Sequence, residues 1–333
     1  MLKTNKSRKI AMKKGRFLEA GFTLVEVMTA MVILGIVATA AYATFQFQHA
    51  SFTVQNRVAE AQQNLRSTLE IMSRDIRMAG YGIPLAVNLP PGLLPTGDNT
   101  IRNIRPLNRT TGADEIYILY MDDMDSSLPP TTAPAGMGIY ANSLTVASVS
   151  GFSKGDLVLV SDGINADMFE VTQPPSAPTL NFDVGGSANL YNSLGSHNPF
   201  PGYAAGDTTI SKARFVRYFI DDVTDPDHPT LMLDRITGES QPLADDIEDM
   251  QIQYGLDTDG DFVVDSLVNS PTAAQIPQVK QVRLFLSART RMLEKGWQDA
   301  RPALADRAAG STDSYRRRAI QNGIVIDLRN PGW

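Results

Sequence analysis

Residues 21–45 read GFTLVEVMTAMVILGIVATAAYATF. The last nineteen of these residues carry no charge, and the first formal charge after Glu26 is Arg57. An uncharged apolar run of this length crosses roughly 30 Å of hydrocarbon as a helix. The sequence therefore predicts a membrane-spanning segment over residues 22–46, as the first half of a longer helix.

The segment before Gly21 is strongly basic. It contains one acid, Glu19, and seven basic residues, which are Lys3, Lys6, Arg8, Lys9, Lys13, Lys14 and Arg16. Lys and Arg are retained on the cytoplasmic side of a membrane. We therefore expect a single-pass protein of the inner membrane, with a cytoplasmic N-terminus and a globular part that faces the periplasm. A conventional signal peptide is cleaved after a shorter apolar run, whereas Gly21 precedes the run here.

Glu26 is unusual, because an acid inside a spanning segment costs about 2.5–3.5 kcal/mol at the bilayer centre and less near an edge. The run from Gly21 to Met28 resembles the prepilin-peptidase site of the type IV pilin superfamily. This resemblance implies that prepilin peptidase removes the leader, residues 1–21, by cleaving between Gly21 and Phe22, and that Phe22 is then N-methylated. It also implies that Glu26 of one subunit pairs with the Phe22 amine of its neighbour during assembly. The alternative is a plain single-span anchor whose acid reaches the interface.

The helix is expected to continue beyond the membrane. Apolar residues recur at intervals of three or four, at Val54, Val58, Ala61, Leu65, Leu69, Met72, Ile76 and Ala79. This spacing is typical of one face of an amphipathic helix, and Gly80 and Gly82 then supply a stop. The sequence predicts a helix over 22–79, about 87 Å long at 1.5 Å per residue, whose amphipathic half lies at 47–80.

From residue 81 onward the sequence changes to short strands and loops. Nine runs are predicted as strands, namely Glu115–Met121, Leu144–Val149, Leu157–Ser161, Met168–Thr172, Ala213–Ile220, Leu231–Ile236, Met250–Tyr254, Val282–Ala288 and Gly323–Leu328. We therefore expect an α+β fold in which the long helix packs on an antiparallel sheet. The sheet belongs to a globular domain at 81–333, with a strand-rich insertion at about 135–210.

The chain also resembles PilW-type minor pilins at both ends. Residues 66–82, RSTLEIMSRDIRMAGYG, resemble the helix end of that family, and residues 247–255, 279–291 and 315–330 resemble its C-terminal part. The resemblance implies a low-abundance pilin that helps to initiate type IV pilus assembly at or near the filament tip. Other major and minor pilins would be its partners, and the pilus on the cell surface its final location.

Composition excludes several function classes. Without residues 1–21, the chain has 23 basic and 35 acidic residues, a net charge of −12, so we expect no nucleic-acid partner. It has no cysteine, which rules out disulfides and thiol catalysis. Its histidines, His49, His197 and His228, are too scattered for a helical zinc pair. No nucleophile elbow or P-loop is present, so the sequence predicts that the protein is not an enzyme.

An aspartate-rich loop is the candidate metal site. Residues 257–265 read DTDGDFVVD and place acids at loop positions 1, 3, 5 and 9, as Asp257, Asp259, Asp261 and Asp265, with the Val263 carbonyl at position 7. Alternating carboxylates of this kind are ligands that calcium prefers. The loop departs from an EF-hand, because Phe262 stands where the glycine is needed and Val268 replaces the final glutamate. Calcium binding and a solvated turn between two strands are both open interpretations.

Alternatives remain for the whole protein and for one basic cluster. A minor pseudopilin of a type II secretion system, of the J type, would have the same leader and helix. A membrane-tethered, calcium-dependent adhesin is an alternative from another class. The cluster Arg316–Arg318 is interpreted either as solvated side chains beside the last strand or as a docking patch for an acidic neighbouring subunit.

Overall fold

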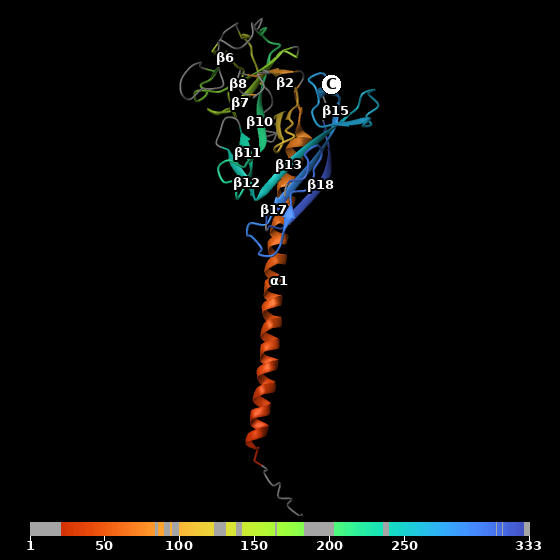
Figure 1. The fold of residues 1–333 in the computed structure, drawn as a ribbon. Helices are drawn as coiled ribbons and strands as arrows, with labels where there is room; N and C mark the ends of the chain where they lie inside the picture. The colour runs from red at the N-terminus through yellow and green to blue at the C-terminus, as the bar shows by residue number, and fades with distance from the viewer. Residues whose placement is uncertain are drawn as a thin grey trace, which may run out of the picture. The chain divides into compact units, whose positions relative to one another are not determined.

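The computed structural model describes residues 21–83, 86–89, 94, 100–122, 131–137, 142–163, 165–182, 203–235, 240–310, 312–314 and 316–329 (Figure 1). The basic leader up to residue 20 and His197 therefore lie outside the described residues. The chain divides into two compact units, Met1–Gln55 and Asn56–Trp333.

One long helix, α1 (Leu24–Met78), begins within two residues of the predicted start and ends one residue before the predicted end. Its first part is apolar and exposed, with a mean hydropathy of 2.2 over eighteen residues, and it is long and apolar enough to cross a membrane. Its buried residues all belong to the second half, at Ala61, Leu65, Thr68, Leu69, Met72 and Ile76. The helix stops where Gly80 and Gly82 adopt left-handed φ angles of 76° and 69°, which glycine accepts without steric cost.

Two larger sheets follow. The first has ten strands in the order β12-β11-β10-β7-β8-β1-β2, with β4 and β5 also on β10 and β3 on β4. Its strands are β1 (Val87–Asn88), β2 (Thr100–Ile101), β3 (Ile104–Leu107), β4 (Glu115–Met121), β5 (Thr131–Thr132), β7 (Leu157–Ser161), β8 (Ala166–Glu170), β10 (Thr209–Asp221), β11 (Thr230–Arg235) and β12 (Gln241–Asp245). The pairs are antiparallel apart from β1 with β8, which meet in parallel at Asn88 and Asp167.

The second sheet has four antiparallel strands in the order β14-β13-β15-β18. They are β13 (Ile247–Leu256), β14 (Ser266–Val268), β15 (Val279–Arg289) and β18 (Arg318–Asp327), and the short 3-10 helix η1 (Ile276–Gln278) precedes β15. Two small ribbons pair β6 (Ser143–Thr145) with β9 (Thr179–Asn181), and β16 (Asp299–Ala300) with β17 (Thr312–Ser314). The predicted α+β class is confirmed, and each of the nine predicted strands overlaps an observed one.

The main core lies between the second half of α1 and both larger sheets. It joins Leu69, Met72 and Ile76 to Tyr218 of β10 and Leu284 of β15, among other buried residues. Figure 1 shows β13, β15 and β18 beside this part of the helix. The predicted insertion supplies β7, which pairs with β10, and β8, which pairs with β7, so the two strands extend the ten-stranded sheet. A separate hydrophobic cluster, which includes Phe182 and Tyr203, lies under this extension.

Candidate processing and assembly site

The predicted cleavage site lies in a short non-helical segment, Gly21 to Thr23, directly before α1. The Phe22 side chain is 86% exposed, so the peptide bond is accessible. A Cβ atom added to Gly21 would meet nothing within 4 Å. Packing among the described residues therefore does not require a glycine at position 21.

Glu26 and Thr23 form a reciprocal cap at the start of α1. The Thr23 backbone N–H and the Thr23 hydroxyl donate to Glu26 Oε2 at 2.9 and 3.0 Å, and the Glu26 N–H donates to Thr23 Oγ1 at 3.3 Å. This is a capping box, and an acid is also favoured at the positive end of the helix dipole. The sequence Thr-x-x-Glu carries the signal for this cap, which the sequence analysis missed. Glu26 thus has an intrachain role beside the predicted intersubunit one.

The aspartate loop connects β13 to β14. Carboxylate oxygens of Asp257, Asp259 and Asp265 lie within 4.8 Å of one another. Asp261 does not belong to this converging group. Its Oδ1 instead accepts the Val263 N–H at 2.8 Å. The structure therefore brings together three of the four predicted carboxylates.

The loop supplies its own donors to these carboxylates. Asp257 accepts the N–H groups of Gly260 at 2.6 Å and Phe262 at 3.1 Å, and Lys280 Nζ lies 3.9 Å from it. Asp265 Oδ2 accepts the N–H and the hydroxyl of Thr258, each at 2.7 Å. These bonds lower the pKa of Asp265. The three acids fit a hard cation by ligand type, and their loop bonds also stabilise them as a turn.

The basic cluster is built into the domain. Arg316 is 6% exposed and donates to the Thr290 carbonyl at 3.0 Å. Arg317 binds Glu294 through two bonds of 2.6 and 2.9 Å, and Arg318 binds Glu248 at 2.6 Å. Arg316 and the side chain of Arg318, which is 4% exposed, are buried on intrachain partners, so neither solvated side chains nor a docking patch describes them. The Arg317 side chain stays 30% exposed beside Glu294.

Buried acids form a second feature that the sequence analysis missed. Asp249, fully buried, accepts Arg301 at 2.8 Å and Arg307 at 2.6 Å, which fasten the loop after β15 to β13. Asp114 is 2% exposed and accepts the N–H groups of Arg109 and Ile252, each at 2.8 Å. Burial raises the pKa of Asp114 to about 7, against the effect of those two bonds. Both partners of Asp249, and Ile252 as a partner of Asp114, are distant in sequence, so no local signal marks these contacts.

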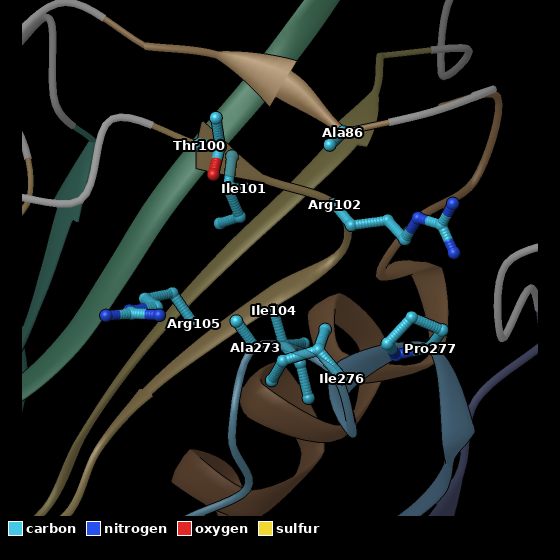
Figure 2. Close-up of a pocket in the computed structure, with 9 residues that line it drawn as sticks. All are labelled: Ala86, Thr100, Ile101, Arg102, Ile104, Arg105, Ala273, Ile276 and Pro277. Carbon is cyan, nitrogen blue, oxygen red and sulfur yellow. The ribbon is translucent and has the colours of Figure 1, made fainter.

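A hollow lined by residues of β2, β3 and η1 and their neighbours has a volume of about 250 Å³. Figure 2 shows Ile101, Ile104 and Ile276 inside it, with Arg102 and Arg105 extending to opposite sides. None of its nine described lining residues is a carboxylate or a histidine, so these residues offer no general base. Elsewhere, His228 is paired with Asp246 at 2.7 Å, and His49 lies on the exposed part of α1.

Comparison with known proteins supports the two resemblances. Residues 217–330 match the family model described as Type IV Pilus-assembly protein W, and residues 16–42 match the prokaryotic N-terminal methylation motif. No curated protein and no solved structure matches the chain. The first match runs from within β10 to the end of β18, and the second covers the cleavage site and the start of α1. These matches, with the apolar helix that fits a membrane-anchored precursor, support a type IV pilin-like protein involved in pilus assembly and are consistent with the PilW type.

Proposed function

We propose that this chain is a minor pilin that helps to initiate, or prime, type IV pilus assembly at or near the filament tip. The observation that carries the proposal is the pairing of a methylation-motif helix with a PilW-type sheet domain in one chain. Apolar side chains such as Met31 and Leu34 are 66% and 67% exposed on that helix. Lipid covers them in the precursor, and helices of other major and minor pilins cover them in a filament.

Deletion of the gene tests this role. We expect few or no surface pili, restored by the intact chain, and immunogold label on the chain at filament ends. A deletion strain that keeps its pili and instead loses secretion of folded proteins would support the J-type pseudopilin. Pili of normal number that no longer attach to a surface in calcium would support the adhesin.

Processing by prepilin peptidase is the first step of the proposed function. The peptidase cuts between Gly21 and Phe22, and Phe22 is then N-methylated. Intact mass and N-terminal sequencing of the membrane-extracted protein test this, and a mature protein that still begins at Met1 in peptidase-positive cells contradicts it. Gly21→Ala is a clean variant because the added Cβ meets nothing in the fold. We expect it to accumulate as full-length precursor in the membrane.

Glu26 acts in assembly through the Phe22 amine of a neighbouring subunit. Its Oε2 holds both Thr23 donors, and Oε1 is the atom that we assign to the amine. Glu26→Ala removes the cap and the intersubunit partner together, whereas Thr23→Val removes only the side-chain half of the cap. We expect Glu26→Ala to insert and be cleaved but fail to enter pili, and Thr23→Val to assemble. Equal assembly defects in both variants would assign the role of Glu26 to the cap alone.

A weak calcium site at the aspartate loop is part of the proposal. Asp257, Asp259 and Asp265 converge within 4.8 Å, and a divalent cation relieves the repulsion between them. With no strong final ligand, we expect a Kd on the order of 10⁻⁴–10⁻³ M, as in extracellular modules. Calcium at ten times its Kd then adds about 1.4 kcal/mol to the free energy of unfolding.

Thermal melting in millimolar calcium, with magnesium as the control ion, tests the site. We expect Asp259→Ala to abolish the calcium-dependent rise in Tm. The matched control is Asp261→Ala, because Asp261 lies on the same loop outside the converging group. If the wild-type Tm is indifferent to calcium, the loop is a turn only.

The proposal includes no turnover chemistry, in keeping with pilins as structural assembly proteins. Hydrolysis by the purified protein that a single aspartate or serine substitution abolishes would overturn this part.

A further inference from the structure

A pair of apolar side chains, Met292 and Leu293, lies exposed on the loop that follows β15. Met292 is 59% and Leu293 is 61% exposed. Single exposed hydrophobic residues are ordinary on a protein surface. Two adjacent exposed hydrophobic residues have a larger combined apolar area. The loop that carries them is also held by several hydrogen bonds and ion pairs.

Cationic side chains from the next strand region fix this loop. Arg317 makes two bonds to Glu294, at 2.6 and 2.9 Å, and its guanidinium lies 3.8 Å from the centre of the Trp297 ring. Arg316 donates to the carbonyls of Thr290 and Arg291. The carbonyl of Glu294 accepts the Trp297 N–H at 3.1 Å, which closes the turn. Met292 and Leu293 are therefore exposed on a loop that these contacts hold in place.

The loop touches the helix close to the membrane. Arg57 Nη2 lies 3.8 Å from Met292 Sδ, and Arg57 is the residue that ends the uncharged stretch from Val27 to Asn56. Thirty residues of helix extend about 45 Å at 1.5 Å each. A bilayer with its headgroups is about 40–45 Å thick. With Glu26 at the cytoplasmic edge, Arg57 is at the level of the periplasmic headgroups, and its contact brings Met292 to the same level.

Charge around the pair also suits a lipid surface. Arg291 and Lys295 flank it in the sequence, Arg57 contacts Met292, and the one acid of the turn, Glu294, is neutralised by Arg317. Arg291 also has Asp245 at 3.3 Å. An apolar tip flanked by Lys and Arg is the composition that inserts at a membrane interface, where the long cationic side chains reach phosphate.

We propose that Met292 and Leu293 insert into the periplasmic leaflet of the inner membrane while the subunit is still membrane-anchored. The loop then forms a second membrane contact of the chain, with an anionic lipid headgroup near Arg57 and Lys295. This inference rests on the membrane anchoring in the proposed function and is independent of any role at the filament tip.

Because the chain has no cysteine, single labels test the contact directly. Leu293→Cys in the full-length protein is labelled with an environment-sensitive fluorophore and placed in nanodiscs of phosphatidylethanolamine and phosphatidylglycerol. Some discs carry lipids with a spin label near the headgroup end of the acyl chain. We expect a blue-shifted emission for this label and its quenching by the spin-labelled lipid.

Two further positions make the result decisive. Val263→Cys is the matched control, because Val263 is 59% exposed and lies at the opposite end of β13 from Leu293. Val263 follows the end of β13 where Leu256 pairs with Val279, and the loop of Leu293 lies beyond the end where Ile247 pairs with Ala288. The two ends of the strand are about 30 Å apart at 3.3 Å per residue. Ala38→Cys, inside the span, reports the anchoring itself.

Quenching at Ala38 and Leu293 but not at Val263 is the expected result. If Leu293 is quenched no more than Val263 while Ala38 is quenched, the loop contact is overturned and the anchoring stands. The apolar pair is then a surface for a neighbouring subunit. If Ala38 is not quenched either, the anchoring and the loop contact are overturned together.

Discussion

Asp75, near the end of α1, holds the helix to two strands of the ten-stranded sheet, and its removal is the sharpest test of the fold. Asp75 Oδ1 accepts the Tyr120 hydroxyl of β4 at 3.0 Å, and Oδ2 accepts the Tyr218 hydroxyl of β10 at 2.6 Å. Both tyrosines are buried, at 3% and 0% exposure. Burial, followed by the Asp75 charge, raises the pKa of both hydroxyls, so they remain protonated donors.

The magnitude follows from these two bonds. A hydrogen bond to a charged group contributes about 1.5–3 kcal/mol, and a buried donor left without its acceptor also loses its solvation. Asp75→Ala removes the acceptor of two buried hydroxyls at once. We therefore expect the free energy of unfolding to fall by about 3–6 kcal/mol, a large part of the stability of an ordinary domain.

Urea denaturation of the soluble fragment Asn56–Trp333, a compact unit of the chain, measures this loss. Asp75→Asn is the conservative variant, since it keeps an oxygen acceptor and should lose less than Asp75→Ala. A double-mutant cycle with Tyr218→Phe isolates one bond, and the two losses should be non-additive. Additive losses, or a loss below about 1 kcal/mol for Asp75→Ala, would refute the argument that this carboxylate fastens the helix.

The other predictions use the same denaturation assay. Asp114 has a pKa raised from 3.8 to about 7, so its contribution to the free energy of unfolding is present at acid pH and is lost as the pH rises through 7. The loss is about 4 kcal/mol. Asp114→Asn should flatten this pH dependence of the free energy of unfolding. Met72→Ala empties a fully buried site and should cost about 2–5 kcal/mol, whereas the neighbouring control Ile71→Ala, at an exposed position, should cost far less. Gly82→Ala forces a φ of 69° on alanine and presses its Cβ into the Met121 side chain, so it should cost more than the about 1–2 kcal/mol of the backbone strain alone.

The helix and the central strands are predictable from sequence because their signals are local. The apolar stripe from Ala61 to Ile76 has the period of a helix, and the buried strands β4 and β7 are continuous apolar runs whose observed limits equal the predicted ones. The two-residue strands β1 and β2 have no such run. They pair with each other, and β1 joins the sheet by pairing with β8 at Asn88 and Asp167, a partner too distant in sequence for any short window to contain.

The functional residues also fall into those with a local sequence signal and those whose partners are distant in sequence. The cleavage motif and the Thr23–Glu26 cap each span only a few consecutive residues. The cap was not predicted, because Glu26 was interpreted only as an intersubunit group. Asp249 is different, because Arg301 and Arg307 are 52 and 58 residues away. Arg318 likewise binds Glu248 across 70 residues. In the sequence alone, such charged residues look like solvated surface residues, because the partners that bury them are brought close only by the fold.

The position of the cap relative to the cut explains how Glu26 can serve both the single subunit and the filament. Thr23 and Glu26 both follow the bond between Gly21 and Phe22, so cleavage leaves the capping box intact. Before the subunit meets a neighbour, the two Thr23 donors reduce the cost of a carboxylate at the membrane edge. In the proposed function, cleavage then creates a cationic amine on Phe22, the residue before Thr23. The proposed docking would therefore add a charged partner to an acid that the helix already holds in place, without first breaking the hydrogen bonds between Glu26 and Thr23.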